Sequence, residues 1–230
     1  MPAISMVLPV YNEEKNLDRV LKFIKTLEFI DEVIIVDDGS SDSTADIVHH
    51  NLWNKARFIQ MGRNVGKTWA VKAGVLEAKY EHILMFDGDL QGLNKADIKQ
   101  MVDRYFNGAD MVIMNYGVDA KEIPNRLLGF FPALSGVRLL SKKRFNEIQF
   151  QESDRFEIET RINDYFFDRD LEISIVNSKN LRSPIKYEKY SVKESIKEGS
   201  SEIKQVIFVN GVSGIGLLLY RWWRLRRLGE

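Results

Sequence analysis

Apolar residues follow two different patterns along the first half of the chain. Short continuous apolar runs predict strands that are buried on both faces of a sheet. Between these runs, apolar residues recur every three or four positions, as they do on one face of a helix. The strands are expected at residues 4–10, 32–36, 57–61, 82–86 and 111–114, and the helices at 13–27, 42–50, 66–78 and 95–107.

The alternation of single strands with single helices indicates an α/β fold with a mainly parallel central sheet flanked by helices. Ligands of such sheets bind outside the carboxyl ends of the strands. Three polar segments directly follow predicted strands, at residues 11–13, 37–39 and 87–89. Carboxylates gathered at one edge repel one another unless a cation or hydrogen-bond donors lie between them, so their convergence predicts a binding site.

The second half of the chain has a less regular pattern. It predicts a strand at 134–140, a helix at 155–167 and a strand at 171–176. Residues 188–201 are polar and rich in lysine, which is typical of a mobile linker. We therefore expect one domain over residues 1–190, with halves at 1–115 and 116–190, followed by a linker and a basic amphipathic tail over 191–230.

Composition excludes several classes of protein. The chain of 230 residues is 44% hydrophobic and 29% charged, as in soluble globular proteins. Its 33 Lys and Arg balance 33 Asp and Glu, so no overall positive charge favours the binding of nucleic acid. The absence of cysteine excludes disulfides and thiolate metal sites and fits the cytoplasm. No signal-peptide pattern and no uninterrupted apolar run of about 18 residues is present, so no spanning helix is expected.

The segment Phe86-Asp87-Gly88-Asp89-Leu90-Gln91 follows an apolar strand. Side chains alternate in an extended segment, so Asp87, Asp89 and Gln91 are expected on one side, where their oxygens suit a hard divalent ion such as Mg²⁺ or Mn²⁺. An ordinary turn after a strand is the competing interpretation, because Asp and Gly are common in turns.

A second acidic segment, Asp37-Asp38-Gly39-Ser40, follows the strand at 32–36. A carboxylate placed just past a strand can accept a hydrogen bond from a nucleoside base or ribose. Helix capping by Ser41 or Asp42 explains the residues that follow but leaves the Asp37-Asp38 pair unexplained.

Four segments together resemble the family 2 glycosyltransferases in order and spacing. They are Val7-Leu8-Pro9-Val10-Tyr11-Asn12-Glu13-Glu14, Val36-Asp37-Asp38-Gly39-Ser40, Asn64-Val65-Gly66-Lys67 and Asp87-Gly88-Asp89-Leu90-Gln91. Within that family the chain is most similar to the dolichyl- or polyprenyl-phosphate sugar synthases, and Ser135-Gly136-Val137-Arg138 and Phe156-Glu157-Ile158-Glu159 resemble two further elements of theirs. The resemblance implies a GT-A-type fold, a nucleotide-diphosphate sugar donor and inversion at the anomeric carbon.

The resemblance also implies a role for individual residues. Pro9, Tyr11, Glu13 and Asp38, with Asp37 beside it, would line the nucleoside pocket. Asp87, Asp89 and Gln91 would serve the metal, with Asp89 essential for catalysis, and Arg138 would serve a phosphate. Lys67 would lie beside the diphosphate or else be a solvated helix residue.

The acceptor side is less defined. Asp154 and Glu157 open a predicted helix near the expected acceptor position, where one of them would take the proton of a hydroxyl acceptor. A phosphate acceptor needs no base, and acidic residues in a first turn are also ordinary partners of the helix dipole. The Ser-Arg pair of the family is missing after Met114-Asn115-Tyr116, and Arg126 is a candidate replacement.

Several functions stay open. The acceptor is expected to be polyprenyl phosphate, with a soluble hydroxyl of phosphoglycerate or a saccharide as the alternative. A non-catalytic nucleotide-sugar-binding protein is the alternative from another class. An oxidoreductase is disfavoured because Pro9-Val10-Tyr11-Asn12 occupies the position of a Gly-X-Gly-X-X-Gly loop.

The tail offers a membrane hypothesis. The apolar residues from Ile215 to Tyr220 run into Arg221-Trp222-Trp223-Arg224-Leu225-Arg226-Arg227, a pattern that suits a helix lying on the cytoplasmic face of a membrane. The alternative is a C-terminal helix packed on the domain, or on a second copy of the chain, with its arginines in solvent.

Overall fold

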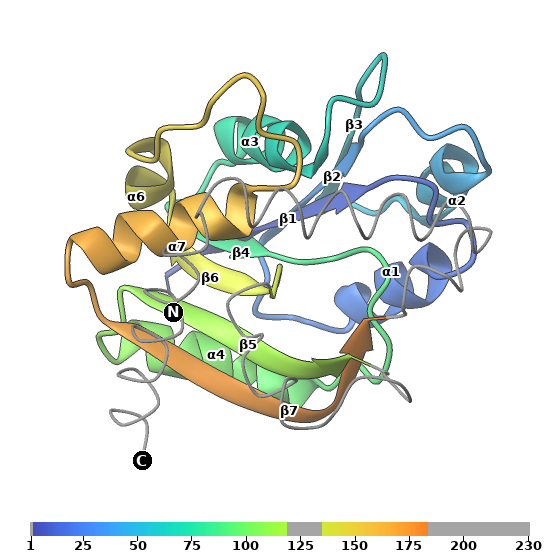
Figure 1. The fold of residues 1–230 in the computed structure, drawn as a ribbon. Helices are drawn as coiled ribbons and strands as arrows, with labels where there is room; N and C mark the ends of the chain where they lie inside the picture. The colour runs from blue at the N-terminus through green and yellow to red at the C-terminus, as the bar shows by residue number, and fades with distance from the viewer. Residues whose placement is uncertain (1, 119–134, 184–230) are drawn as a thin grey trace.

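The computed structural model describes residues 2–118 and 135–183, and these residues build a seven-stranded sheet with helices on both faces (Figure 1). The strands are β1 (Ile4–Val10), β2 (Glu32–Asp37), β3 (Ala56–Gln60), β4 (His82–Met85), β5 (Met111–Val118), β6 (Arg138–Ser141) and β7 (Ile173–Ser183). Their order across the sheet is β3-β2-β1-β4-β6-β5-β7. Only β6 runs antiparallel to its neighbours β4 and β5, so the expected mainly parallel sheet is confirmed.

The helices divide between the two faces of the sheet (Figure 1). They are α1 (Leu17–Lys25), α2 (Thr44–Asn51), α3 (Lys67–Glu77), α4 (Lys95–Phe106), α6 (Lys142–Asn146) and α7 (Ile158–Asp168). Apolar residues of α1, α2 and α4 join one core cluster, and those of α3, α6 and α7 join the other. Alternate residues of β2 enter opposite clusters, Val33 and Ile35 on one side and Ile34 and Val36 on the other, which explains why this strand is apolar throughout.

The parallel arrangement brings the carboxyl ends of β1, β2 and β4 together. β1 lies between the other two, with Val10 level with Asp37 of β2 and Val7 level with Met85 of β4. The segments that follow these strands therefore emerge at one edge of the sheet, as the sequence predicts.

Several predicted boundaries are wrong. α1 begins at Leu17 and not at residue 13, because residues 13–16 form a turn closed by the N–H groups of Asn16 and Leu17 on the carbonyl of Glu13. α7 begins at Ile158, three residues later than expected. β7 continues to Ser183 because it pairs with β5 along most of its length, beyond the apolar residues from which it was predicted.

The sequence did not predict α6, a short helix that Ser141 caps by accepting a hydrogen bond from the N–H of Arg144 at 3.1 Å. The linker and tail at 188–230, Arg126 and the first residue of the strand expected at 134–140 lie outside the described residues. Within the described part of the chain, no helix is long and apolar enough to cross a membrane.

Candidate functional site

The loops that follow β1 and β2 are joined by hydrogen bonds at the carboxyl edge of the sheet. The backbone N–H of Asp38 donates to the carbonyl of Val10 at 2.9 Å, which extends the contact between the strands. Asn12 has a φ of 53°, and its N–H donates to the Ser40 hydroxyl at 2.9 Å. Its side-chain oxygen accepts from the N–H of Ser41, also at 2.9 Å. Asn12 thus links the two loops.

Asp37 and Asp38 are both buried, with 0% and 3% of their surface exposed. One oxygen of Asp37 accepts from the N–H of Ser40 at 2.9 Å and from its hydroxyl at 2.5 Å, which closes the turn after β2. The two oxygens of Asp38 accept from the N–H groups of Val65 and Gly66, each at 2.8 Å. Burial raises the pKa of Asp38, although these two hydrogen bonds act in the opposite direction. Both carboxylates thus stabilise backbone, and their contact with a nucleoside stays a prediction.

The loop that Asp38 holds sets the start of α3. Gly66 has a φ of 103°, and a Cβ added there would lie 2.7 Å from the Cα of Arg155. Glycine is therefore required where this loop passes the segment before α7. The N–H of Thr68 donates to the Arg155 carbonyl at 2.9 Å, so the first turn of α3 is tied to the segment before α7. Lys67, the first residue of α3, is positioned by these contacts.

Lys67 joins two carboxylates from distant parts of the chain. Its Nζ lies 2.7 Å from Oδ1 of Asp87, just past β4, and 2.7 Å from Oε1 of Glu159 in α7. The side chains of Lys67, Asp87 and Glu159 are 24%, 16% and 8% exposed. Burial alone would lower the pKa of Lys67, but the two carboxylates outweigh it and raise that pKa above its ordinary value. Lys67 is therefore a charged member of the site and not a solvated helix residue.

The Ser135-Gly136 segment lies directly against this ion pair. A Cβ added at Gly136 would meet both carboxylate oxygens of Asp87 and would lie 2.5 Å from Nζ of Lys67. The ion pair between Lys67 and Asp87 would break if either side chain moved away. A residue without a Cβ at position 136 therefore allows the backbone to approach both groups. The Ser-Gly element noted in the sequence thus packs on the acidic segment after β4.

The chain turns at Gly88 and Asp89, so the expected alternation of Asp87, Asp89 and Gln91 along an extended segment is wrong. An oxygen of Asp89 accepts a hydrogen bond from the Ser183 hydroxyl at 3.2 Å, at the end of β7. The backbone N–H and carbonyl of Gln91 both pair with Arg182 at 2.9 Å. The turn is therefore in contact with Lys67 through Asp87 and with the end of β7 through Asp89.

Asp154 and Glu157 hold the segment that precedes α7. Arg161 contacts Asp154 through two nitrogens, at 2.9 and 3.0 Å, and Asp154 is 2% exposed. The hydrogen bonds that Arg161 donates to Asp154 raise the pKa of Arg161 above its ordinary value. One oxygen of Glu157 accepts from the N–H groups of Arg155 and Phe156, at 2.5 and 2.8 Å. These contacts give both carboxylates a structural role, and a role as a base stays untested.

Arg138 is fully buried in β6 and faces α7. Its Nε donates to the carbonyl of Ser135 at 2.7 Å, and its Nη1 donates to the side-chain oxygen of Asn163 at 2.6 Å. A guanidinium with no exposed surface does not meet a phosphate without rearrangement. In this structure Arg138 holds the Ser135-Gly136 segment through the Ser135 carbonyl. This role differs from the phosphate contact that the resemblance implies.

The remaining predicted residues follow β1. Pro9 lies within the strand, level with Val36 of β2, and Pro9 and Tyr11 are partly exposed. Glu13 is buried, with 8% of its surface exposed, and its N–H donates to the Thr44 hydroxyl at 2.8 Å. The structure thus brings these residues to the same edge as the two acidic segments.

Glu159 is not among the residues predicted for the site, although it belongs to the Phe156-Glu157-Ile158-Glu159 element that resembles the family. The Phe-Glu-Ile-Glu element was the available signal, but spacing along α7 does not reveal a partner 92 residues away. Among the described residues, no group of three or more His, Cys, Asp or Glu side chains is suited to hold a metal ion. Proteins commonly bind magnesium through one or two carboxylates and the phosphates of the substrate, and the assignment of Asp87 and Asp89 to such a metal stays a prediction.

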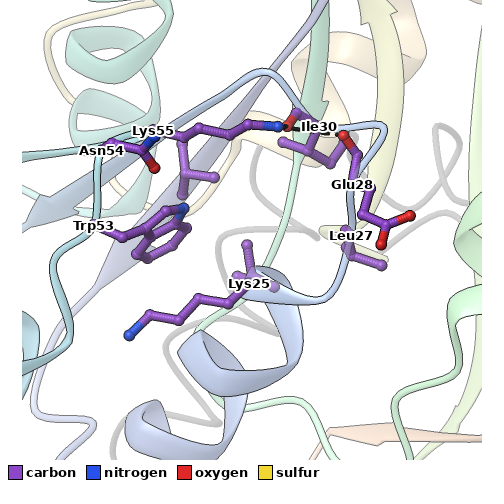
Figure 2. A pocket seen from close by; sticks show the side chains of 9 residues that line it. Lys25, Leu27, Glu28, Ile30, Trp53, Asn54 and Lys55 are labelled. Atoms are coloured by element: carbon purple, nitrogen blue, oxygen red, sulfur yellow. Dashed lines mark hydrogen bonds between the residues drawn. The ribbon is translucent and has the colours of Figure 1, made fainter.

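A cavity of about 260 Å³ lies at the opposite edge of the sheet (Figure 2). It is formed by the end of α1 and by the segments that enter β2 and β3, and its lining includes Leu27, Ile30 and Trp53. Lys55 bridges these segments by donating to the Ile30 carbonyl at 2.7 Å. Because these residues precede the strands, the cavity is separate from the acidic cluster at their carboxyl ends.

Parts of this chain are similar to known proteins. The model of the family described as glycosyl transferase family 2 matches residues 5–164. An undecaprenyl-phosphate 4-deoxy-4-formamido-L-arabinose transferase of Proteus mirabilis is 37% identical over 116 residues, which cover 47% of this chain and 35% of that protein. A dolichyl-phosphate beta-glucosyltransferase of Mus musculus is 39% identical over 99 residues, which cover 37% of this chain and 31% of that protein.

Among solved structures, the chain is similar to glucosyl-3-phosphoglycerate synthase from Mycobacterium tuberculosis in complex with Mn²⁺, uridine diphosphate and phosphoglyceric acid. The TM-score is 0.65 at 22% identity, over 79% of this chain and 70% of that chain. This similarity establishes the fold, and the expected GT-A-type architecture is confirmed.

Replacing Asp38 tests its structural role. Asp38→Ala leaves the N–H groups of Val65 and Gly66 without their acceptors, and each unpaired buried group costs about 1–3 kcal/mol. We expect a lower free energy of unfolding in urea and faster hydrogen exchange at these two amides. Asp38→Asn keeps one acceptor and should give an intermediate loss. Unchanged exchange at both amides in Asp38→Ala would contradict this assignment.

Replacing Gly88 tests the packing of the turn. A Cβ at Gly88 would lie 2.9 Å from Cγ1 of the buried Val10, so Gly88→Ala should lower the free energy of unfolding by about 1–3 kcal/mol. Adding Val10→Ala clears the space, and the double variant should lose less than the sum of the single changes. Gly62→Ala is the matched control, because nothing lies within 4 Å of its added Cβ. An equal loss from Gly62→Ala and Gly88→Ala would refute the packing argument.

Proposed function

The chain belongs to glycosyl transferase family 2, and from this premise we propose that it transfers a sugar from a UDP- or GDP-linked donor to an acceptor with inversion at the anomeric carbon. The matched segments cover only 35% and 31% of the two relatives described above, so their substrates enter here as a guide. The observation that carries the proposal is the set of charges around Lys67, at the edge where β1, β2 and β4 end.

We assign the donor diphosphate to the Lys67 side of this edge. The Lys67 ammonium is held by two carboxylates and still has N–H donor capacity for a phosphate oxygen. The loops after β1 and β2, with Pro9, Tyr11 and Glu13, form the adjoining surface for the nucleoside. Hydrogen bonds join these loops before the donor binds, so donor binding costs less conformational entropy.

Asp87 and Asp89 would hold Mg²⁺ or Mn²⁺, with Gln91 as a further oxygen donor. When bound, the metal would neutralise the diphosphate and make it a better leaving group. The protein's own contribution is to place two carboxylates on one tight turn, which the contact of Asp89 with Ser183 and that of Asp87 with Lys67 hold from opposite sides.

The acceptor that the contacts favour is a phosphate. Asp154 and Glu157 are the two carboxylates expected to serve as a base, and both are engaged in contacts that stabilise the segment before α7. A phosphate nucleophile is already anionic and needs no base. Polyprenyl phosphate therefore ranks above the hydroxyl of phosphoglycerate or a saccharide, and the printed names of both sequence relatives contain a lipid phosphate.

A lipid acceptor requires access to a membrane. We propose that the segment 215–227, which lies outside the described residues, contacts the cytoplasmic face through its arginines and through Trp222 and Trp223. The alternatives are a tail that packs on the domain or on a second copy of the chain.

Replacing Asp89 separates an enzyme from a binding protein. Asp89→Ala should lower sugar transfer and donor hydrolysis by at least about 100-fold, because loss of a bridging metal removes several kcal/mol of transition-state stabilisation. Excess EDTA should have the same effect on the wild type. Asp103→Ala is the control, since Asp103 is exposed in the last turn of α4, near the start of β5 and away from the carboxyl ends of the strands. Full turnover in EDTA would refute metal dependence, whereas nucleotide-sugar binding without any turnover would favour the non-catalytic alternative.

Removing residues 214–230 tests the membrane hypothesis. We expect the full-length chain to float with anionic liposomes at low salt and to dissociate at high salt, because screening weakens each arginine–lipid attraction of about 1 kcal/mol. The truncated chain should stay in the soluble fraction and transfer less sugar to lipid phosphate, while donor hydrolysis is unchanged. Unaltered transfer to lipid phosphate after truncation would favour a soluble acceptor and a tail packed on protein.

A further inference from the structure

Glu159 occupies a position that helix packing alone does not explain. It is the second residue of α7, its side chain is 8% exposed, and the neighbouring helix positions Ile158 and Ile162 belong to the apolar core. A carboxylate in such surroundings is costly unless it is paired. Its partner is the Lys67 ammonium at 2.7 Å, so α7 supplies a negative charge to the edge of the sheet where β4 ends.

Lys67 contacts both Glu159 and Asp87. Asp87 contacts the same ammonium at 2.7 Å, and Asp87 is also the residue to which the proposed function assigns the metal. An ammonium and a divalent cation compete for one carboxylate, because both are attracted to it and repel each other. Glu159 offers the ammonium an anchor that does not depend on Asp87.

We propose that Glu159 is a positioning residue that holds the Lys67 ammonium beside Asp87. The ammonium then stays in place for the donor diphosphate when the oxygens of Asp87 bind a divalent cation. The proposal rests on the proposed function. The tight fit of Gly136 against Asp87 and Lys67 supports it, because the backbone there blocks one side of the ammonium. Glu159 therefore determines the affinity of the site for the metal without contacting metal or donor.

The test is the affinity for Mn²⁺, measured from the electron paramagnetic resonance signal of the free ion, with and without UDP. Glu159→Gln should weaken the binding of Mn²⁺ alone by about tenfold, because the ammonium then depends on Asp87 only. Lys67→Met should have opposite effects on the two ligands. It should strengthen the binding of Mn²⁺ alone, by removing the competing cation, and weaken the binding of UDP in the presence of Mn²⁺.

Two further variants separate positioning from a general charge effect. Glu152→Gln removes the same charge from an exposed residue near α7 and should leave Mn²⁺ affinity unchanged. In the Lys67→Met background, Glu159→Gln should change Mn²⁺ affinity less than it does in the wild type, since the positioning effect passes through the ammonium. Glu159→Asp keeps the charge and should recover part of the affinity even if Glu159→Gln folds poorly, which thermal melting will show.

The outcomes distinguish this inference from the proposed function. If wild-type protein transfers sugar but Glu159→Gln has the same effect in both backgrounds, or none, Glu159 is only a structural partner and the inference fails. If Mn²⁺ affinity responds as expected and no donor is ever turned over, the inference stands and the catalytic proposal fails. Absence of Mn²⁺ binding in every variant, with and without UDP, overturns both.

Discussion

The contact of the Lys67 ammonium with Asp87 and Glu159 joins the start of α3, the end of β4 and α7, and the geometry of the site depends on it. Three partly or fully buried charges at one point are stable only because each has an opposite partner within hydrogen-bond distance. The backbone at Gly136 packs directly on this contact. Elements far apart in the chain are thereby fixed relative to the acidic turn after β4, which gives the site a defined shape.

The acidic residues of the chain serve two different purposes. Asp38 accepts from two backbone amides, and Asp154 pairs with Arg161, so both hold loops in position and are almost fully buried. Asp87 and Asp89 are more exposed and lie on a turn that other elements support from both sides. A carboxylate that is already committed to backbone or arginine is a poor base, whereas one that borders solvent can exchange partners. This difference separates the supporting carboxylates from those to which the proposed function assigns a metal.

The strands and helices that the hydrophobic pattern predicts for the first half of the chain are all present, because burial on two faces of a parallel sheet leaves a clear apolar signal in each strand. Boundaries were less accurate where polar contacts decide them. The turn at Glu13, which delays α1, depends on backbone hydrogen bonds, and the extension of β7 to Ser183 depends on pairing with β5. Neither contact alters the local hydrophobic pattern, so neither is visible in it.

The sequence by itself determined the order of the elements, the parallel sheet and the edge at which Asp38 and Asp87 gather, since strand direction and crossover handedness follow from local pattern. Tertiary structure decided which carboxylate has which partner. Asp89 lies in a turn and not in an extended segment, Arg138 points into the core, and Glu159 reaches Lys67 across 92 positions. Such pairings are set by the packing of helices on the sheet, and no spacing along the chain encodes them.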